Sequence, residues 1–300
     1  MCNKLVSVII PLFNSEKYIG NTIMSVINQT YKNWELFVVD DFSSDLSRSI
    51  VRKFMELDDR IKLIESEVNF GGPARPRNIG IHLSNGEYIA FLDSDDLWYP
   101  EKLQLCMRSF HPDVDIIFHD FVKYGDVNFF TNKNMKGRKL DTPVTKSLLL
   151  HDNVIINSSV IARKKLIEDV GYIDESKNMI AAEDYNLWLK ISIITNNFLY
   201  IPKVLGEYLV GDGNISSKDM SICSKNATQG FEKYLNNDEL LKYNAILDYM
   251  RGRYLYINQE YSMAKIYLRK TLKSGVIDLR IKSLFMLCMS NIYVFFNFSD

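Results

Sequence analysis

The 300-residue sequence has few cysteines, few histidines and no excess of either charge. Its four cysteines, at positions 2, 106, 223 and 288, form no C-x-x-C pair and have no ligand-like spacing with the four histidines. A structural zinc site and a disulfide framework are therefore not expected, and reduced thiols are typical of the cytosol.

The charges of the sequence are balanced, since 36 Lys and Arg residues and 37 Asp and Glu residues give a net charge of −1. No basic excess exists to neutralise phosphates, so nucleic acid is not an expected partner.

Long hydrophobic runs are also absent. No apolar stretch reaches the roughly 18 residues that a membrane span requires. The apolar run 5–10 is short, meets Pro11 and lacks a small-residue cleavage site, so we interpret it as a buried first strand rather than a signal peptide. The composition, with 47% hydrophobic and 24% charged residues, is that of a soluble globular protein of about two domains.

Short apolar runs alternate with segments of helical length. The predicted strands are 6–10, 35–39, 60–65, 88–92 and 114–118, and the predicted helices between them are 15–29, 44–58, 74–84 and 100–110. This alternation favours an α/β fold with a mostly parallel sheet covered by helices on both faces. A further helix is expected at 183–194, and the chain is expected to be helical from about 216 to its end. In such sheets ligands bind beyond the carboxyl ends of the strands.

Aspartates follow two of the predicted strands. Asp93 and Asp95 come directly after the strand 88–92, and carboxylates one residue apart can converge on Mg²⁺ or Mn²⁺. Asp40 and Asp41 follow the strand 35–39, where a carboxylate can accept hydrogen bonds from a base or ribose. Each pair also suits a turn or a helix N-cap. Folding gains nothing from two acidic strand ends in one sheet, whereas a bound metal offsets their charge, so we favour a functional site.

The loop 69–78 carries adjacent glycines and two arginines. Gly71-Gly72 permits close approach of the backbone, and Arg75 or Arg77 is expected to pair with phosphate or with the acidic cluster. The alternative is a Gly/Pro loop with solvated arginines.

The predicted helix 183–194 begins with two acids. At helical spacing Asp184 shares a face with Trp188 and Ile191, so we expect Asp184 to point inward and Glu183 to lie on the wetter side. An inward carboxylate at a helix start is a candidate general base. The alternative is a first-turn acid stabilised by the helix dipole.

Five motifs now form a pattern. They are Pro11-Leu12-Phe13-Asn14, Val39-Asp40-Asp41-x-Ser43-Ser44-Asp45, Gly71-Gly72 with Arg77-Asn78-x-Gly80, Phe91-Leu92-Asp93-Ser94-Asp95-Asp96 and Glu183-Asp184-Tyr185-x-Leu187-Trp188. Together they resemble family 2 glycosyltransferases with the GT-A fold, over about residues 5–210. Each motif is weak alone, but five in this order at fitting spacing are highly specific.

The resemblance implies a domain organisation and an activity. A GT-A domain is expected at 1–215, with a nucleotide-sugar-binding half at 1–100 and an acceptor half at 101–215, followed by a helical region at 216–300. The implied activity is an inverting transfer from a nucleotide sugar, most often UDP-linked. The implied acceptor is a hydroxyl group of a glycan or a polyprenyl-linked molecule in surface polysaccharide synthesis.

The resemblance also assigns residues. Those expected at the donor are Pro11, Phe13, Asn14, Asp41, Arg77, Asp93 and Ser94. Asp93 and Asp95 would hold Mn²⁺ or Mg²⁺, which neutralises charge on the departing diphosphate, and Asp184 would deprotonate the acceptor hydroxyl.

Three positions depart from the family pattern. Phe42 replaces the glycine usual after the double aspartate, so the loop at the uridine is expected to be stiffer or differently aimed. Arg75-Pro76 stands where small residues are frequent, which would add a phosphate contact or alter sugar preference. The segment 208–214 lacks the Arg or His that many relatives carry beside the diphosphate, leaving Asp212 or nothing as the substitute.

The C-terminal region combines positive charge with apolar runs. Residues 263–282 contain Lys265, Arg269, Lys270, Lys273, Arg280 and Lys282 against the single acid Asp278. Apolar runs follow at 284–289 and 292–296. A basic, apolar helix suits an anionic membrane surface, which predicts a cytoplasmic protein peripheral on the inner membrane. The alternative is a helix that docks on the catalytic domain or on a second subunit.

Other functions fit less well. A sugar nucleotidyltransferase would favour a Gly-rich basic loop where residues 11–14 lie, and an aspartyl-phosphate phosphatase would carry its D-x-D motif after the first strand. The remaining alternative is a catalytically silent sugar-nucleotide-binding subunit that supports a partner transferase. Retention of Asp184 together with Asp93 and Asp95 disfavours it, because a silent protein needs no base.

Overall fold

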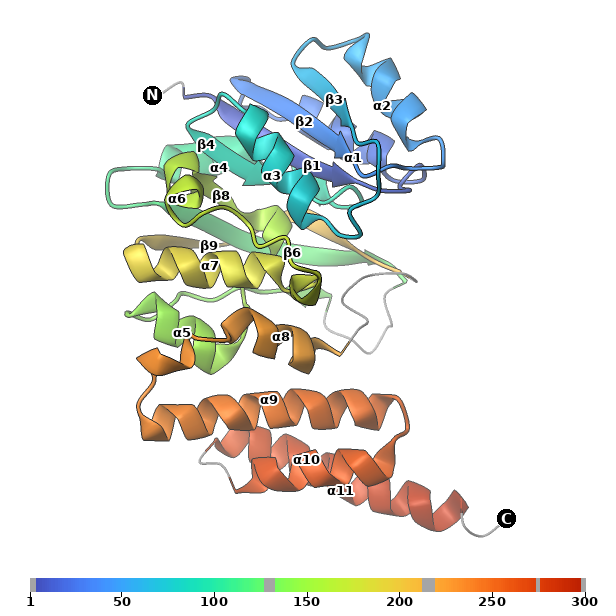
Figure 1. Cartoon of the computed structure of the whole chain (residues 1–300), viewed down its shortest axis with the longest axis vertical. Coiled ribbons are helices and arrows are strands. Elements are labelled where there is room, and N and C mark those ends of the chain that lie inside the picture. The colour runs from blue at the N-terminus through green and yellow to red at the C-terminus, as the bar shows by residue number, and fades with distance from the viewer. Residues whose placement is uncertain (1–3, 127–132, 212–218, 274–275, 298–300) are drawn as a thin grey trace. The chain divides into compact units, whose positions relative to one another are not determined.

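The computed structural model describes residues 4–126, 133–211, 219–273 and 276–297, and the side chains of the last helix as far as Ser290. The chain divides into two compact units. The first comprises Met1–Leu140 and Val154–Asp212, and the second comprises Asp141–Asn153 and Gly213–Asp300. The first unit contains the sheet, and the second is helical wherever regular structure is described (Figure 1).

The first unit contains the elements that the sequence pattern predicts, with small shifts in their ends. They are β1 (Val6–Leu12), α1 (Ile19–Ile27), β2 (Trp34–Asp40), α2 (Ser47–Met55), β3 (Ile61–Glu65), α3 (Ala74–Leu83), β4 (Tyr88–Phe91), β5 (Leu97–Trp98), α4 (Lys102–Ser109), β6 (Ile116–Gly125), β7 (Asn134–Met135), β8 (Ile161–Arg163), α6 (Lys164–Asp169), α7 (Glu183–Ile194) and β9 (Phe198–Val210). The strand predicted at 114–118 begins later and extends further, as β6.

The sheet has the order β3-β2-β1-β4-β8-β6-β9-β5, with β7 paired to β6. Strands β3, β2, β1 and β4 are parallel, as predicted, and β6 and β9 are also parallel. The short strands β8, β5 and β7 pair antiparallel to their neighbours, so the far half of the sheet is mixed. In the parallel half Leu12 lies opposite Asp40, and Ile9 lies opposite Phe91. The strand ends before residues 13, 41 and 92 therefore meet at one edge.

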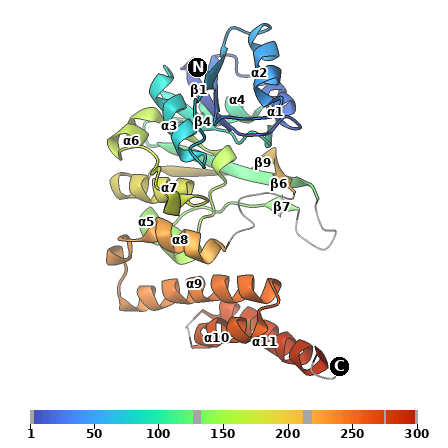
Figure 2. The same ribbon diagram turned by 45° about the vertical axis from the view of Figure 1, so that its right-hand side comes forward.

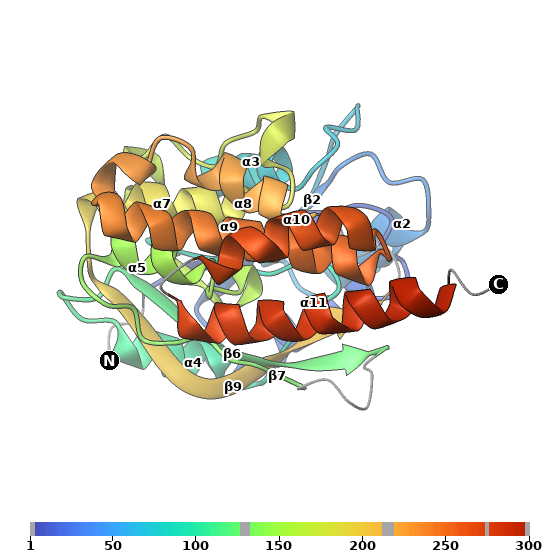
Figure 3. The same ribbon diagram turned by 90° about the horizontal axis from the view of Figure 1, so that it is seen from below.

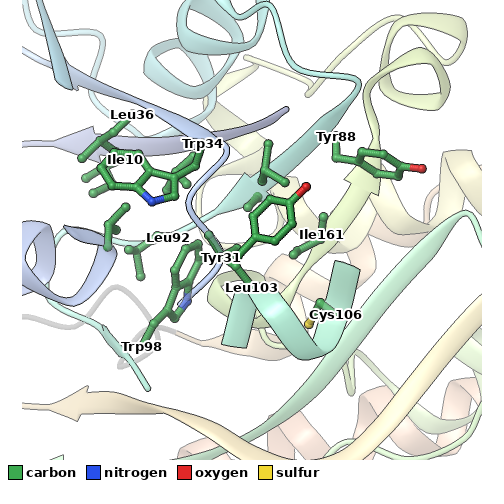
Figure 4. Packing of buried hydrophobic residues seen from close by; sticks show 14 of the residues in the cluster. Ile10, Tyr31, Trp34, Leu36, Tyr88, Leu92, Trp98, Leu103, Cys106 and Ile161 are labelled. Carbon is green, nitrogen blue, oxygen red and sulfur yellow. The ribbon is translucent and has the colours of Figure 1, made fainter. Parts of the chain in front are cut away.

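Helices cover both faces of this sheet, as the near-continuous apolar strands predicted. Figure 2 shows α3 and α7 on one side and α1 and α2 on the other. On the α1 side, Ile10 joins a core cluster with residues such as Leu36, Leu92 and Leu103 (Figure 4). Full burial of each such aliphatic side chain contributes about 1.5–3 kcal/mol.

On the opposite face, a glycine sets the spacing between α3 and the sheet. A Cβ atom at Gly80 would lie 2.8 Å from Cγ2 of Ile9 on β1. Only glycine permits this close approach, which brings the first turn of α3 against the carboxyl edge of the sheet. The glycine of the Arg77-Asn78-x-Gly80 motif thus positions the arginine.

The second unit consists of α5 (Val144–His151), α8 (Met220–Thr228), α9 (Asn237–Ile257), α10 (Tyr261–Leu272) and α11 (Ile277–Asn297). A capping box starts α9, because Asn236 and Glu239 each accept from the other's backbone N–H. Helices α9, α10 and α11 pack together (Figure 3) around Leu255, Ala264, Leu268 and Leu287. The ammonium of Lys146 on α5 lies 2.8 Å from the Glu239 carboxylate.

The α/β prediction and the helical C-terminal region are confirmed. One segment inside the predicted range 1–215 lies elsewhere, because α5 belongs to the second compact unit. Its contacts are with α9 and with the short helical turn Glu232–Tyr234, and a local sequence pattern cannot reveal such long-range packing.

Candidate functional site

Hydrogen bonds join the loops that follow β1 and β2. The backbone N–H of Asn14 donates to the Ser43 hydroxyl at 3.0 Å, and the N–H of Ser44 donates to Oδ1 of Asn14 at 2.8 Å. The N–H of Asp41 donates to the carbonyl of Leu12 at 2.7 Å. Pro11, as the penultimate residue of β1, precedes this joined edge. The predicted donor residues Asn14 and Asp41 are thereby brought together.

The loop after β4 is joined to the start of α1. The hydroxyl groups of Ser94 and Ser15 lie 2.7 Å apart, and Thr22 Oγ1 donates to the carbonyl of Ser94 at 3.0 Å. Ser94 therefore lies at the same edge of the sheet as the loop after β1, and its contact with a donor stays a prediction.

Asp41 holds a third loop in place. Its Oδ1 accepts from the backbone N–H of Phe70 at 2.7 Å, and Nδ2 of Asn69 donates to its carbonyl at 2.9 Å. Asp41 is buried, and burial raises the pKa of its carboxyl above the ordinary value. The loop that carries the glycines and arginines is thus fixed to the end of β2.

Phe42 has a strained backbone. Its φ of +64° lies in the left-handed region, where a bulky side chain costs about 1–2 kcal/mol and glycine costs almost nothing. This conformation explains why the family pattern has glycine at the position of Phe42. The Phe42 side chain is 51% exposed.

Arg77 links two acidic segments from inside the protein. Its side chain is buried, with Nη1 donating to Glu183 Oε1 and Nη2 donating to Asp93 Oδ1, both at 2.7 Å. Burial alone would lower the pKa of the guanidinium, but Asp93 and Glu183 outweigh burial and raise it. Arg77 therefore stays charged and connects the end of β4 to the start of α7. The prediction that Arg75 or Arg77 pairs with the acidic cluster is confirmed for Arg77.

Asn78 fixes the segment before α7 to the start of α3. Its amide donates to the carbonyl of Ile173 and to the Glu175 carboxylate, both at 2.9 Å, and accepts from the N–H of Ile173 at 3.1 Å. Arg75 forms an ion pair with Glu175 at 3.3 Å and lies over the Phe70 ring at 4.6 Å. Arg75 is therefore engaged with Glu175 rather than with the cluster after β4.

The carboxylates after β4 have separate environments. Asp96 is buried, where its Oδ2 accepts from the Ser158 hydroxyl at 2.5 Å and its Oδ1 from the N–H of Leu209 at 3.2 Å. Burial, with Asp93 and Asp95 nearby, raises its pKa well above the ordinary value. Asp95 is half-buried, and burial followed by repulsion from Asp93 raises its pKa to about 6. The carboxylates after β4 therefore repel one another.

Asp93 and Asp95 are the carboxylates of this cluster that remain as candidate metal ligands, since both oxygens of Asp96 are bonded within the protein. Among the described residues, no group of three or more His, Cys, Asp or Glu side chains is arranged to hold a metal ion. Mg²⁺ is commonly bound by one or two carboxylates together with substrate phosphates. The residues present therefore fit a divalent cation that shares its ligands with a bound diphosphate.

The start of α7 reverses one expectation. Glu183 was predicted on the wetter side, yet it is 5% exposed and paired with Arg77, whereas Asp184 is half-buried. The reason is that side chains all round the first two turns of α7 are buried, including Asn186 and Leu187, and the exposed positions Ile193 and Ile194 lie at its end. Helical periodicity does not reveal that the start of a helix is covered on nearly all sides.

Asp184 has the properties of a base near neutral pH. Burial, with the Glu183 carboxylate adding to it, raises the pKa of Asp184 to about 7, although Arg77 acts in the opposite direction. The N–H of Tyr185 donates to its Oδ1 at 2.6 Å. A carboxylate poised near the operating pH is suited to general base catalysis.

A cavity of about 170 Å³ lies beside Glu183. Oε1 of Glu183 bonds to Arg77, but its Oε2, also buried, has no hydrogen-bond partner among the described residues. The other lining residues are Phe70, Gly72, Pro73, Ala74, Arg75, Asp174, Glu175, Ser176, Lys177 and Ile180. The cavity is lined by both polar and apolar side chains. A buried acceptor without a partner in such a cavity is suited to a ligand that donates hydrogen bonds.

Sequence analysis missed several residues of this site. Asn157 donates to Asp93 Oδ1 at 3.2 Å, the Ser158 hydroxyl accepts from the N–H of Asp93 at 3.0 Å, and the Tyr124 hydroxyl donates to the carbonyl of Asp95. The run Asn157-Ser158-Ser159, polar after an apolar segment, was the available signal. Residues 208–210 are the end of β9, and residue 211 follows the strand. Asp212, Gly213 and Asn214 of the predicted closing segment lie outside the described residues.

The sequence matches the family model described as "Glycosyl transferase family 2" over residues 7–171. The Escherichia coli UDP-Glc:alpha-D-GlcNAc-diphosphoundecaprenol beta-1,3-glucosyltransferase WfgD is 34% identical over 220 residues, 72% of this chain and 81% of that protein. The putative teichuronic acid biosynthesis glycosyltransferase TuaG of Bacillus subtilis is 30% identical over 231 residues, 74% of this chain and 85% of that protein.

Solved structures share the fold. The complex of S. aureus TarS 1-349 with UDP-GlcNAc aligns with a TM-score of 0.61 at 20% identity, covering 95% of this chain and 90% of that one. The mannosyltransferase PcManGT from Pyrobaculum calidifontis, in complex with GDP-Man and Mn²⁺, aligns with a TM-score of 0.62 at 18% identity, covering 95% and 80%. The predicted GT-A fold is confirmed.

Proposed function

The chain belongs to glycosyl transferase family 2 and is a glycosyltransferase, and we propose that it moves a sugar from a UDP-linked donor to a hydroxyl group of a lipid-linked saccharide, with inversion. The observation that carries the proposal is the pair of ion pairs Asp93–Arg77 and Arg77–Glu183, in which Arg77 and Glu183 are buried. These ion pairs connect the strand end suited to a diphosphate with the helix start that carries Asp184. The transferase domain is assigned to 1–215 and the helical region to 216–300.

The donor lies at the carboxyl edge of the parallel strands. Its binding residues are Pro11, Phe13, Asn14, Asp41, Arg77, Asp93 and Ser94. Their support is the joined loops after β1, β2 and β4. UDP as the carrier is supported by the name of the Escherichia coli relative, which uses UDP-Glc.

Asp93 and Asp95 would hold Mn²⁺ or Mg²⁺ together with the donor diphosphate. The bound cation would neutralise charge on that leaving group. Support comes from the two carboxylates themselves, whose mutual repulsion is relieved by a cation.

In the proposed reaction Asp184 accepts the proton of the acceptor hydroxyl. The hydroxyl oxygen forms a new bond to the anomeric carbon of the sugar, and the bond from that carbon to the diphosphate breaks with its electron pair leaving on UDP. A single displacement of this kind inverts the anomeric centre. The pKa of Asp184, about 7, suits a base that must be deprotonated before it reacts.

The cavity beside Glu183 would take the donor sugar ring. Its volume of about 170 Å³ is below the roughly 300–1,000 Å³ of pockets for larger ligands. The unpartnered Oε2 of Glu183 would accept from a sugar hydroxyl, and the apolar side chains of Pro73 and Ile180 would face the ring.

The acceptor is proposed to be a polyprenyl-linked saccharide of a surface polysaccharide pathway, by analogy with the acceptor in the name of the Escherichia coli relative. The enzyme would then act in the cytoplasm at the inner membrane face. In the described part of the chain, no helix has the length and hydropathy needed to cross a membrane.

Contact with the membrane is assigned to α11. Ile277, Ile281, Leu284 and Phe285 are 55–71% exposed and share one face by their spacing. Arg280 flanks that face, which suits anionic lipid. Residues 292–296 of the predicted apolar run lie beyond the described side chains. We expect sedimentation with phosphatidylglycerol vesicles, weakened by Phe285→Glu. An unchanged Phe285→Glu variant, or self-association through this face instead, would contradict the membrane role.

The function is tested by thermal unfolding with nucleotide diphosphates and their sugars, with and without Mn²⁺. A ligand at about 100 times its Kd adds roughly 2.7 kcal/mol to stability, which is visible as a higher Tm. We expect a shift with UDP compounds that Mn²⁺ enlarges. No shift with any nucleotide would contradict the proposed donor. Binding without turnover on any lipid-linked acceptor would favour the silent subunit instead.

A further inference from the structure

Phe42 combines a strained backbone with an exposed side chain. Its φ is +64°, and its side chain is 51% exposed, so burial of the ring offsets the strain only in part. Among the described residues, no ring or cation lies against the Phe42 ring. The ring thus adds little to stability where glycine would be unstrained.

The loop cannot relax around Phe42, because both neighbours are fixed. The carbonyl of Asp41 accepts from Asn69 at 2.9 Å, and the N–H of Ser43 donates to Asp40 Oδ2 at 3.1 Å. The Ser43 hydroxyl is in turn bonded to the N–H of Asn14. The surrounding bonds therefore fix the backbone on both sides of Phe42, whose side chain is exposed. Strain maintained in this way is typical of positions that contact a ligand.

A second exposed aromatic ring stands on the neighbouring loop. Phe13, also 51% exposed, directly precedes Asn14, just as Phe42 directly precedes Ser43, the residue to which Asn14 is bonded. Two exposed phenylalanines therefore flank one hydrogen bond at the edge assigned to the donor. Aromatic rings are the groups on which nucleobases stack.

We propose that Phe42 contacts the nucleobase of the donor, its ring supplying, with Phe13, the aromatic surface on which the base stacks. This inference rests on the proposed function and adds to it a base-binding residue at a position where the family pattern has glycine. The strained backbone is then the cost of presenting the ring.

The test compares UDP binding by calorimetry, in the presence of Mg²⁺, for four variants of the full chain. Phe42→Gly removes the ring and the strain, Phe42→Leu keeps the strain without an aromatic face, and Phe42→Tyr keeps both. Gln259→Gly is the matched control, because Gln259 has φ +63° and an exposed side chain in the second unit.

We expect Phe42→Gly and Phe42→Leu to raise the Kd for UDP about tenfold, equivalent to about 1.4 kcal/mol. Phe42→Tyr should bind as the unaltered chain does. Phe42→Gly should have a Tm no lower than that of the unaltered chain, as should Gln259→Gly, which should leave UDP affinity unchanged.

Unchanged UDP affinity in Phe42→Gly would overturn the inference. So would normal affinity in Phe42→Leu, which would show that the loop conformation rather than the ring matters. If the unaltered chain binds no UDP, the proposed donor itself is wrong, and this inference falls with it. The two failures are distinguished by the unaltered chain alone.

Discussion

Two acidic strand ends that look alike in the sequence differ in what their carboxylates do. At the end of β2, Asp40 accepts from the N–H of Ser43, and Asp41 accepts from the N–H of Phe70. These carboxylates are buried, and both are used to hold loops in place. At this end of the sheet backbone N–H groups bond to both carboxylates, although the buried Oδ1 of Asp40 has no hydrogen-bond partner among the described residues.

At the end of β4 three carboxylates crowd together. Repulsion from Asp93 contributes, after burial, to the raised pKa of both Asp95 and Asp96, and the cation that compensates is Arg77. One guanidinium shared between Asp93 and Glu183 does not neutralise the whole group. The comparison teaches that the carboxylate charge after β4 remains partly uncompensated, which suits a cation, whereas backbone N–H groups after β2 hold the proposed donor residue Asp41 in a fixed position.

The largest expected effect comes from removing the cation of the β4 end. Arg77→Met leaves buried Glu183 without a partner for Oε1 and frees Asp93 to repel Asp95. Breaking a buried ion pair from one side typically costs about 3–5 kcal/mol. We expect urea denaturation to show a loss of this size, together with loss of UDP binding.

Arg75→Met is the matched control for that variant. Arg75 is paired with Glu175, but its side chain is 53% exposed, so solvent screens the pair. Exposed ion pairs contribute about 0–1 kcal/mol, and the loss of stability should stay in that range. Equal losses for the two variants would remove the distinction between the buried and the exposed arginine.

The next largest effect concerns the base. Asp184→Asn should keep affinity for UDP but lower transfer by about 10²-fold or more, the usual contribution of a general base. Steady-state transfer rates and calorimetric UDP affinity are the measurements. Equal loss of binding and transfer would make Asp184 a structural residue.

A direct test of the comparison changes one carboxylate at each strand end. Asp41→Ala should cost about 1–3 kcal/mol, because it leaves the N–H of Phe70 without its acceptor. Asp95→Asn should cost little, since it removes a repelled charge, but it should abolish the Mn²⁺-dependent part of the UDP thermal shift. A stability loss in Asp95→Asn, with loss of the Mn²⁺ effect in Asp41→Ala, would mean that the cation binds at the β2 end and that the β4 end holds the fold.

The last prediction concerns the dependence of stability on pH. The pKa of Asp184 is raised to about 7 in the folded chain, so the unfolded chain loses this proton at lower pH than the folded chain does. The contribution of Asp184 to stability is therefore full below about pH 4 and is lost as pH rises to about 7. Relative to the unaltered chain, the free energy of unfolding of Asp184→Asn should rise by up to about 4 kcal/mol between pH 4 and pH 8, since one pKa unit corresponds to about 1.4 kcal/mol. A constant difference across this range would show that Asp184 has an ordinary pKa.

Much of the fold was predictable from the sequence, because local patterns carry it. The strands that became β1, β2, β3 and β4 are short apolar runs, and their parallel pairing follows from the helices between them. The antiparallel strands β5, β7 and β8 span only two or three residues each, too few for periodicity to register. The placement of α5 in the second unit depends on packing against residues far along the chain.

Most residues of the candidate site were predictable from the sequence, but the hydrogen-bond and ion-pair partners of those residues were less so. The expectation that Arg75 or Arg77 pairs with the acidic cluster is confirmed by Arg77, whereas Arg75 pairs with Glu175. Asn157 and Ser158 were missed because their roles depend on reaching Asp93 and Asp96 from more than sixty residues away. The catalytic role of Asp184 stays a prediction.

By itself the sequence determined which residue types stand at each strand end, because alternation of strands and helices is a local property of side chains. It did not determine which acid of the pair at 183–184 is buried. Tertiary structure decided that: Arg77, lying 106 positions earlier, pairs with Glu183 inside the protein and leaves Asp184 half-buried. An ion pair of this kind exists only once α3 and α7 lie over the same sheet, and the close contact of Gly80 with Ile9 sets the depth at which α3 does so.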